Sequence, residues 1–118
     1  MKTGIIVDDA AIMRLRLREI LEPDFSVVGE AGNGDEAVRL CGELTPDFIT
    51  LDISMPQTNG IEALKQIQEN YPEVRVIMVS AVGQKRLVID ALQYGAVDFV
   101  IKPFDSDRVL QAVHRVFG

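Results

Sequence analysis

The chain has 118 residues, 47% of them hydrophobic and 25% charged, and its formal net charge at pH 7 is -6. An acidic chain without a basic cluster is not expected to bind nucleic acid directly or to lie on an anionic membrane surface. The single cysteine, Cys41, excludes an internal disulfide, and the lack of a secretory signal or membrane-length apolar stretch predicts a cytoplasmic protein without membrane insertion.

Short apolar runs rich in β-branched residues alternate along the chain with stretches of helical periodicity. Strands are predicted near 4–7, 26–30, 47–51, 74–79 and 98–101, and helices near 10–22, 34–44, 60–71, 84–94 and 105–117. Strands that alternate with helices are typical of a parallel sheet with helices on both faces. The length leaves no room for a second core, so residues 1–118 are expected to form a single domain.

Two helix starts carry the same signature. Asn33 is followed three residues later by Glu36, and Asn59 by Glu62, so each asparagine side chain can accept a hydrogen bond from a free N–H of the first turn. Residues that commonly end helices stand at Pro23, Pro46, Pro72 and Gly95. These signals divide the chain into five strand–helix units.

The handedness of the crossovers restricts how these units are arranged. When the winding reverses after the second strand, right-handed crossovers place strands one and three together, and the strand order 2-1-3-4-5 follows. The order is also that of flavodoxin. The predicted fold is therefore α/β, a doubly wound (βα)5 flavodoxin-like sandwich of three layers around a parallel sheet.

Four of the predicted strands run into residues that can bind a phosphoryl group or its metal ion. In chain order these residues are Asp8 and Asp9, Asp52, Ser80 and Lys102. Because neighbouring parallel strands end along one edge of the sheet, the side chains are expected to meet in one crevice. A carboxylate can accept a phosphoryl group when cations neutralise the oxygens of the donor, and Asp52 is the candidate acceptor.

The other residues of this set suit the same chemistry. Mg2+ prefers oxygen ligands, so the pair Asp8 and Asp9 is an expected partner of the acceptor. Three crowded carboxylates favour metal binding and should raise the pKa of at least one of them in the metal-free protein. Lys102 can offer a positive charge, and the Ser80 hydroxyl a hydrogen bond, to phosphoryl oxygens.

Together these motifs resemble those of response-regulator receiver domains over the entire chain. The matching segments are Asp8-Asp9, Asp52-Ile53-Ser54-Met55-Pro56 with Gly60, Ser80-Ala81, and Lys102-Pro103-Phe104. Within this family the chain is most similar to the stand-alone chemotaxis response regulators, through segments 80–84 and 95–103. The resemblance implies a signalling protein of a two-component system that assists its own phosphorylation and dephosphorylation, rather than an enzyme with a separate substrate.

The resemblance also implies a role for each residue of the acidic site. Asp52 would receive the phosphoryl group from a histidine kinase, with Mg2+ as the cofactor. Asp9 and Asp52 would ligate the metal directly, Asp8 would act largely through water, and the backbone carbonyl of Ser54 would complete the protein's share of ligands.

A switch between two conformations is implied as well. Ser80 would move toward the added phosphoryl oxygens, the loop after the fourth strand would reorder, and Phe99 would change between exposed and buried rotamers. Because many family members have tyrosine where this chain has Phe99, burial alone must set the switch. The target, by resemblance the flagellar motor switch, would bind the face of the fourth helix, fifth strand and fifth helix. The expected output residues are Lys85, Val88, Leu92, Phe99 and Ile101.

The lifetime of the phosphorylated form depends, by the same resemblance, on the residues that flank the hydrolytic water. These residues stand two positions after the acceptor and two after the hydroxyl residue, and here they are Ser54 and Val82. Valine has no donor or acceptor with which to orient water. Slow autodephosphorylation is therefore expected, with a separate phosphatase as a further partner.

Other proteins share parts of this pattern. Phosphatases of the haloacid dehalogenase type also form an aspartyl phosphate, but they carry a second Asp where this chain has Ser54. A flavodoxin-type module needs a hydroxyl- and glycine-rich phosphate loop after the first strand, where Asp8 and Asp9 would repel the flavin phosphate. Within the receiver family, an end at Gly118 favours a stand-alone regulator, and the alternative is a receiver from a larger transcription factor or methylesterase.

Overall fold

A computed structural model describes residues 1–55 and 59–117. The strands are β1 (Thr3–Val7), β2 (Ser26–Ala31), β3 (Phe48–Asp52), β4 (Arg75–Ala81) and β5 (Asp98–Lys102). The helices are α1 (Ala11–Leu21), α2 (Gly34–Leu44), α3 (Gly60–Asn70), α4 (Lys85–Gln93) and α5 (Ser106–Phe117). Every predicted element is present, with ends shifted by one or two residues at most. Pro56, which belongs to one of the matching motifs, lies outside the described residues.

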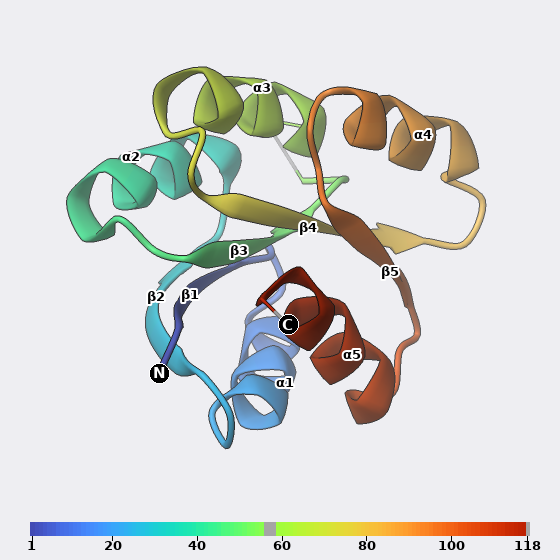
Figure 1. Ribbon diagram of the computed structural model, residues 1–118. Coiled ribbons are helices and arrows are strands. Elements are labelled where there is room, and N and C mark those ends of the chain that lie inside the picture. The colour runs from blue at the N-terminus through green and yellow to red at the C-terminus, as the bar shows by residue number, and fades with distance from the viewer. Residues whose placement is uncertain (56–58, 118) are drawn as a thin grey trace.

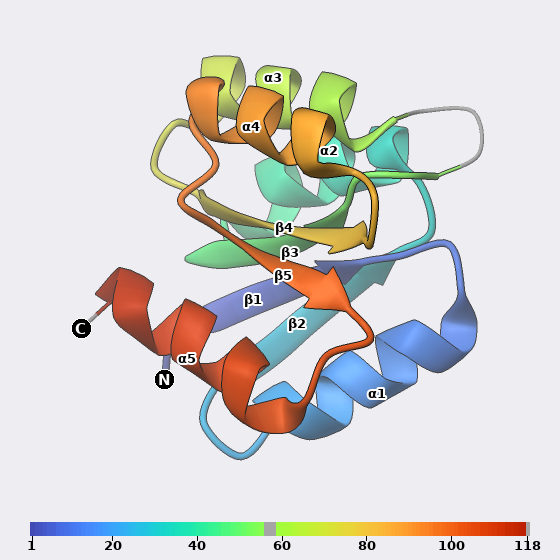
Figure 2. The same ribbon diagram turned by 90° about the vertical axis from the view of Figure 1, so that its right-hand side faces the viewer.

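The strands form one parallel sheet in the order β2-β1-β3-β4-β5, which confirms the prediction. Helices α2, α3 and α4 cover one face of this sheet, and α1 and α5 cover the other (Figure 1). The view turned by 90° shows the sheet between these two helical layers (Figure 2). The three central strands β1, β3 and β4 therefore have a helical layer on both sides.

Two apolar clusters fill the spaces between the sheet and its helices. Ile49, Leu51 and Met78 belong to the cluster under α2, α3 and α4. Phe48 and Val79 belong to the cluster under α1 and α5. Because alternate residues of β3 and β4 point into opposite clusters, these strands are apolar on both faces, as is usual for buried parallel strands. The continuous apolar runs in the sequence reflect this double burial.

The predicted helix caps are present. The side-chain oxygens of Asn33 and Asn59 accept hydrogen bonds from the backbone N–H groups of Glu36 and Glu62, each at 2.9 Å. These bonds satisfy donors that have no partner inside the helix, and such caps stabilise a helix by about 1 kcal/mol. They fix where α2 and α3 begin, on the same side of the sheet.

Gly60 allows α3 to begin directly against the end of β3. Its N–H donates to the carbonyl of Ile53 at 2.7 Å. A Cβ atom at this position would lie 2.3 Å from the backbone oxygen of Asp52, so no other residue fits without moving the main chain. The contact sets the distance between the first turn of α3 and the residue that ends β3.

Candidate functional site

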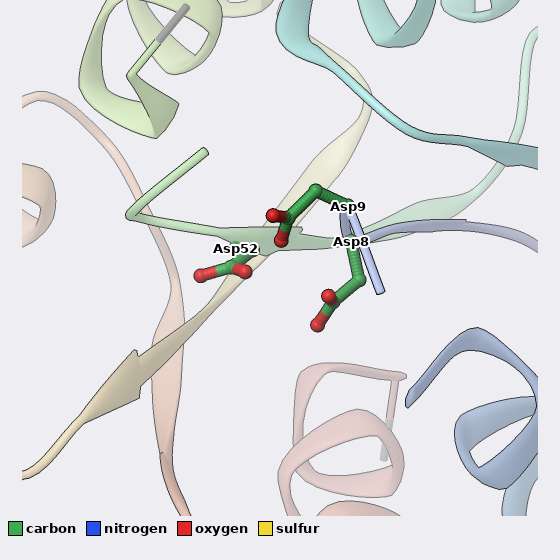
Figure 3. A group of neighbouring side chains, drawn as sticks. All are labelled: Asp8, Asp9 and Asp52. Carbon is green, nitrogen blue, oxygen red and sulfur yellow. The ribbon is translucent and has the colours of Figure 1, made fainter. Parts of the chain in front are cut away.

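The carboxylates of Asp8, Asp9 and Asp52 gather at the carboxyl edge of the sheet. Each contributes an oxygen, and the three oxygens lie within 4.8 Å of one another. Figure 3 shows Asp8 and Asp9 at the end of β1 and Asp52 at the end of β3. The two strands are hydrogen-bonded neighbours, with Val7 opposite Leu51, which brings the acidic residues together. The structure thus places these three side chains where the sequence predicted them.

Backbone donors orient two of these carboxylates. The N–H of Ala10 donates to Oδ1 of Asp8 at 2.9 Å, and the N–H of Ser54 donates to Oδ1 of Asp52 at 3.1 Å. Both residues are buried, so a defined hydrogen bond replaces the water that their carboxylates lose. In each case Oδ1 binds the following loop, and Oδ2 remains directed to other partners.

Lys102 is the partner of both Oδ2 atoms. Its Nζ lies 2.9 Å from Oδ2 of Asp8 and 3.3 Å from Oδ2 of Asp52. Lys102 ends β5, beyond β4 from Asp52, so its long side chain reaches across the tip of β4. The ammonium group balances part of the negative charge that the acidic residues bring to this edge.

The environment changes the pKa of both the acceptor candidate and its cationic partner. Burial raises the pKa of Asp52; the charge of Lys102 opposes this effect and that of Asp8 adds to it. For Lys102, burial lowers the pKa, but the hydrogen bond to Asp8 and the carboxylate charges outweigh it, and the net change is upward. A raised carboxyl pKa was predicted from crowding alone. Loss of water is instead the larger cause for Asp52.

Ser80 lies inside β4 and not after it, because the strand extends to Ala81. The residue is buried, and within residues 1–55 and 59–117 its hydroxyl oxygen has no hydrogen-bond partner. A buried hydroxyl without a partner is costly, and a phosphoryl oxygen at this edge would provide one. The strand neighbours of Ser80 are β3 and β5, which end in Asp52 and Lys102.

The donor set at this edge fits Mg2+. All three clustered side chains offer carboxylate oxygens, the hard ligands that Mg2+ prefers, and neither sulfur nor imidazole is among them. Magnesium sites usually combine one or two carboxylates with waters and phosphate oxygens. The roles assigned to Asp8, Asp9, Asp52 and Ser54 as metal ligands remain predictions.

Gln84 connects the two loops beside the site, which the sequence did not predict. Its side-chain oxygen accepts a hydrogen bond from the N–H of Ala81 at 2.7 Å. Its amide group donates to the hydroxyl of Ser54. The β3–α3 and β4–α4 loops are therefore tied through one carboxamide. The only sequence signal was a polar residue immediately before α4, which has no specific pairing rule.

The predicted output residues lie on one groove. This groove has a volume of about 370 Å³ and is lined by α4, β5 and the loop between β4 and α4. All five predicted residues line it: Lys85, Val88, Leu92, Phe99 and Ile101. Ser80 also lines the groove, so the predicted output residues lie beside one of the residues predicted for the acidic site.

The apolar residues of this groove differ in exposure. Val88 is only 6% exposed and packs in the apolar cluster beneath α4. Leu92 and Ile101 are 40% and 43% exposed and form the apolar rim. Phe99 is half-buried and contacts the same cluster from β5. Helical spacing alone did not distinguish the inner from the outer side of α4.

Comparison with known proteins gives a consistent result. Residues 5–114 match the family described as the response regulator receiver domain. The chain is 51% identical over 115 residues to the chemotaxis protein CheY of Bacillus subtilis, covering 97% of this chain and 96% of that protein. It is also 51% identical over 106 residues to a protein-glutamate methylesterase/protein-glutamine glutaminase of Thermotoga maritima, but this match covers only 30% of that protein.

A solved structure supports the same assignment. The fold matches a chain in the crystal structure of the CheX-CheY-BeF3-Mg complex from Borrelia burgdorferi with a TM-score of 0.94 and 39% identity, covering 99% of this chain and 90% of that one. Across the part of the chain that the structure describes, no helix has both the length and the apolar character needed to cross a membrane.

Proposed function

The chain belongs to the response-regulator receiver domain family, and from this premise we propose that Asp52 accepts a phosphoryl group from a histidine kinase with the help of Mg2+. One observation carries the proposal. A buried carboxylate at the end of the central strand stands beside two more carboxylates and 3.3 Å from the ammonium group of Lys102. This arrangement offers a nucleophile, one cationic partner and a set of carboxylate oxygens that suits the metal ion phosphoryl transfer requires.

Asp9 and Asp52 would bind Mg2+ directly, Asp8 would do so through water, and the Ser54 carbonyl would complete the set. When bound, the metal neutralises charge on the phosphoryl oxygens. In the transfer, an oxygen of Asp52 forms the new bond to phosphorus while the P–N bond to the donor histidine breaks, and the imidazole nitrogen retains the electron pair. The Asp52 carboxylate must be unprotonated for this attack.

Lys102 and Ser80 would hold the transferred group. Lys102 already contacts both carboxylates, so its ammonium group needs only a small displacement to reach a phosphoryl oxygen. The Ser80 hydroxyl would donate to another oxygen. Ser80 would thereby gain a charge-assisted hydrogen bond, and Lys102 would exchange a carboxylate partner for a phosphoryl oxygen.

We further propose that phosphorylation switches the α4-β5-α5 face for binding of a target protein, with Ser80 and Phe99 as the moving residues. The groove that joins Ser80 to Phe99 supports this route. Similarity to chemotaxis proteins over nearly the whole chain supports a stand-alone role in chemotaxis, and the flagellar motor switch is the target that we propose. The alternative is a receiver within a larger methylesterase or transcription factor.

Chemical trapping of the adduct tests the acceptor. The protein is incubated with acetyl phosphate and Mg2+, the acyl phosphate is reduced with borohydride, and the reduced residue is located by mass spectrometry. We expect reduction at Asp52 only, none in Asp52→Asn, and normal labelling in Asp35→Asn, which alters an exposed aspartate of α2. Labelling at another residue, or undiminished labelling of Asp52→Asn, would overturn the proposal.

A further inference from the structure

We propose that Arg14 is a positioning residue for the acidic site: its guanidinium group fixes the peptide that joins Asp8 to Asp9 and thereby holds the Asp9 carboxylate toward Asp52. This inference rests on the proposed Mg2+ site, since its consequence is a change in metal affinity. Arg14 lies on α1 and is not itself a candidate ligand, so its effect on the metal would be indirect.

The contact behind the proposal is a hydrogen bond to the main chain. Nη1 of Arg14 donates to the backbone carbonyl of Asp8 at 2.7 Å. The N–H of Asp8 donates to the carbonyl of Ala31 at 3.1 Å, at the end of β2. Both polar groups of the Asp8 main chain are therefore held, one by the sheet and one by Arg14.

Holding this carbonyl also orients the next residue. The C=O of Asp8 and the N–H of Asp9 belong to one planar peptide, so fixing the oxygen fixes the direction in which Asp9 leaves the strand. Asp9 is exposed and lies between β1 and α1, where neither sheet pairing nor the helix sets its backbone. Its place near Asp52 therefore depends on the peptide that precedes it, together with the turn that the N–H of Ala10 closes on Oδ1 of Asp8.

Arg14 is in turn held by Glu30 on β2. Its Nε donates to Oε1 of Glu30 at 3.1 Å, while the other carboxylate oxygen accepts from Nε of Arg18 at 2.7 Å. Both oxygens of Glu30 are thus occupied, and the hydrogen bond to Glu30 raises the pKa of Arg18. A guanidinium is planar and its donors have fixed directions, so pairing Nε with Glu30 directs Nη1 to the carbonyl of Asp8.

Charge and positioning predict opposite effects on metal binding, which makes the proposal testable. If Arg14 acted only through its charge, removing it would strengthen the binding of a cation nearby. If Arg14 positions the loop, removing it weakens Mg2+ binding, because an ordered ligand becomes mobile. Loss of a residue that orients a metal ligand typically reduces affinity 10- to 100-fold.

Arg18 provides a matched control. It lies on the same helix, carries the same charge and binds the same glutamate, yet its bonds go to Glu30 and Glu22 rather than to the acidic loop. The variants are Arg14→Gln and Arg18→Gln, with Arg14→Lys as a charge-preserving third. The chain has no tryptophan, so affinity is measured by isothermal titration calorimetry with MgCl2.

We expect Arg14→Gln to bind Mg2+ about tenfold more weakly than wild type and Arg18→Gln to remain within about twofold. In the metal-free proteins, the amide resonance of Asp9 should shift in Arg14→Gln and stay in place in Arg18→Gln. Arg14→Lys should weaken binding less than Arg14→Gln, since a lysine keeps the charge but lacks the paired donors.

Unchanged or tighter Mg2+ binding by Arg14→Gln would overturn the positioning role, as would an equal loss in Arg18→Gln. If Arg14→Gln fails to fold, the Mg2+ affinity of Arg14→Lys is compared with that of wild type instead. An Mg2+ affinity equal to that of wild type would count against the proposal. Absence of Mg2+ binding by the wild-type protein would instead overturn the proposed metal site, so the two failures are distinguishable.

Discussion

Nζ of Lys102 lies 3.3 Å from Oδ2 of Asp52, the proposed phosphoryl acceptor. The acceptor therefore already has a cationic partner before any metal or phosphoryl group arrives. Because the same ammonium group also pairs with Asp8, it connects the tips of β1, β3 and β5. Metal binding and phosphorylation must both act on this ion pair, and removing either partner should have distinct effects.

Asp9→Ala and Lys102→Ala should separate metal binding from the response to phosphorylation. Asp9→Ala removes a proposed direct ligand and is expected to lose Mg2+ affinity and phosphorylation together, by about tenfold or more. Lys102→Ala removes a positive charge that competes with the metal, so Mg2+ affinity should be retained or increased while the response is lost. Calorimetric titration with MgCl2 and acetyl phosphate labelling measure the two properties. Equal Mg2+ affinity in wild type and Asp9→Ala would contradict this account.

Asp52→Asn should stabilise the metal-free protein at neutral pH. Burial raises the pKa of Asp52, which means that its charged form is disfavoured in the folded protein relative to the unfolded chain. The penalty is present above the raised pKa and is removed as pH falls through it, since the folded carboxyl then takes up a proton. Urea unfolding with a chelator should show Asp52→Asn as the more stable protein at pH 7, with a smaller difference near pH 4. A difference that grows toward acid pH would exclude this explanation.

Cys41 should make folding sensitive to alkaline pH. Burial raises the pKa of its thiol from 9.0 to about 11, so between these values the unfolded chain ionises while the folded protein does not. The contribution of the buried thiol to folding stability is complete below pH 9.0, the pKa in the unfolded chain, and is lost as pH rises toward the folded pKa of about 11. Relative to Cys41→Ala, wild type should lose about 1 kcal/mol of unfolding free energy from pH 8 to pH 10. Parallel losses in the two proteins would assign the alkaline effect to other groups.

Phosphorylation should change the groove lined by α4, β5 and the β4–α4 loop more than the rest of the domain. The N–H of Ala81 is bound by Gln84, and a shift of Ser80 toward a phosphoryl oxygen would disturb this bond and the Phe99 side of the groove. With beryllium fluoride and Mg2+, we expect amide exchange to change several-fold along residues 81–102 and little along α2. Hydrogen exchange followed by mass spectrometry measures this. A uniform change, or one confined to the strand ends, would show that the domain does not switch.

Val82→Glu should shorten the lifetime of the phosphorylated form. Val82 is 77% exposed, so a glutamate fits without disturbing the core, and its carboxylate can orient the attacking water. We expect roughly tenfold faster loss of the phosphoryl group, which is less than the rate increase of about 100-fold or more that a well-placed general base supplies. Val97→Glu, an exposed valine before β5, is the control and should leave the rate unchanged. If Val82→Glu is no faster than wild type, Val82 does not control hydrolysis.

The fold and the meeting of the strand-end residues could be predicted because their causes are local or topological. Apolar runs mark the strands, asparagine caps mark α2 and α3, and parallel strands end along one edge, so Asp52 and Lys102 had to approach each other. The burial of Val88 was not predictable in this way. It depends on how α4 is rotated on the sheet, and helical spacing gives only the period of a helix.

Side-chain links between loops were also missed, for a different physical reason. The hydrogen bond from Gln84 to Ser54 joins residues 30 positions apart, and the ion pair of Arg14 and Glu30 joins residues 16 apart. Long polar side chains have many rotamers of similar energy, and tertiary contacts select among them. No periodicity or motif in the sequence encodes that selection.

The close contact between Gly60 and the backbone of Asp52 affects which substitutions genetic studies of this protein should find. A screen for loss of signalling should recover substitutions at Gly60 together with those at the carboxylates, although glycine has no functional group. Even alanine there would push α3 away and move the acceptor. A residue can thus be indispensable to the chemistry solely through the volume that it leaves empty.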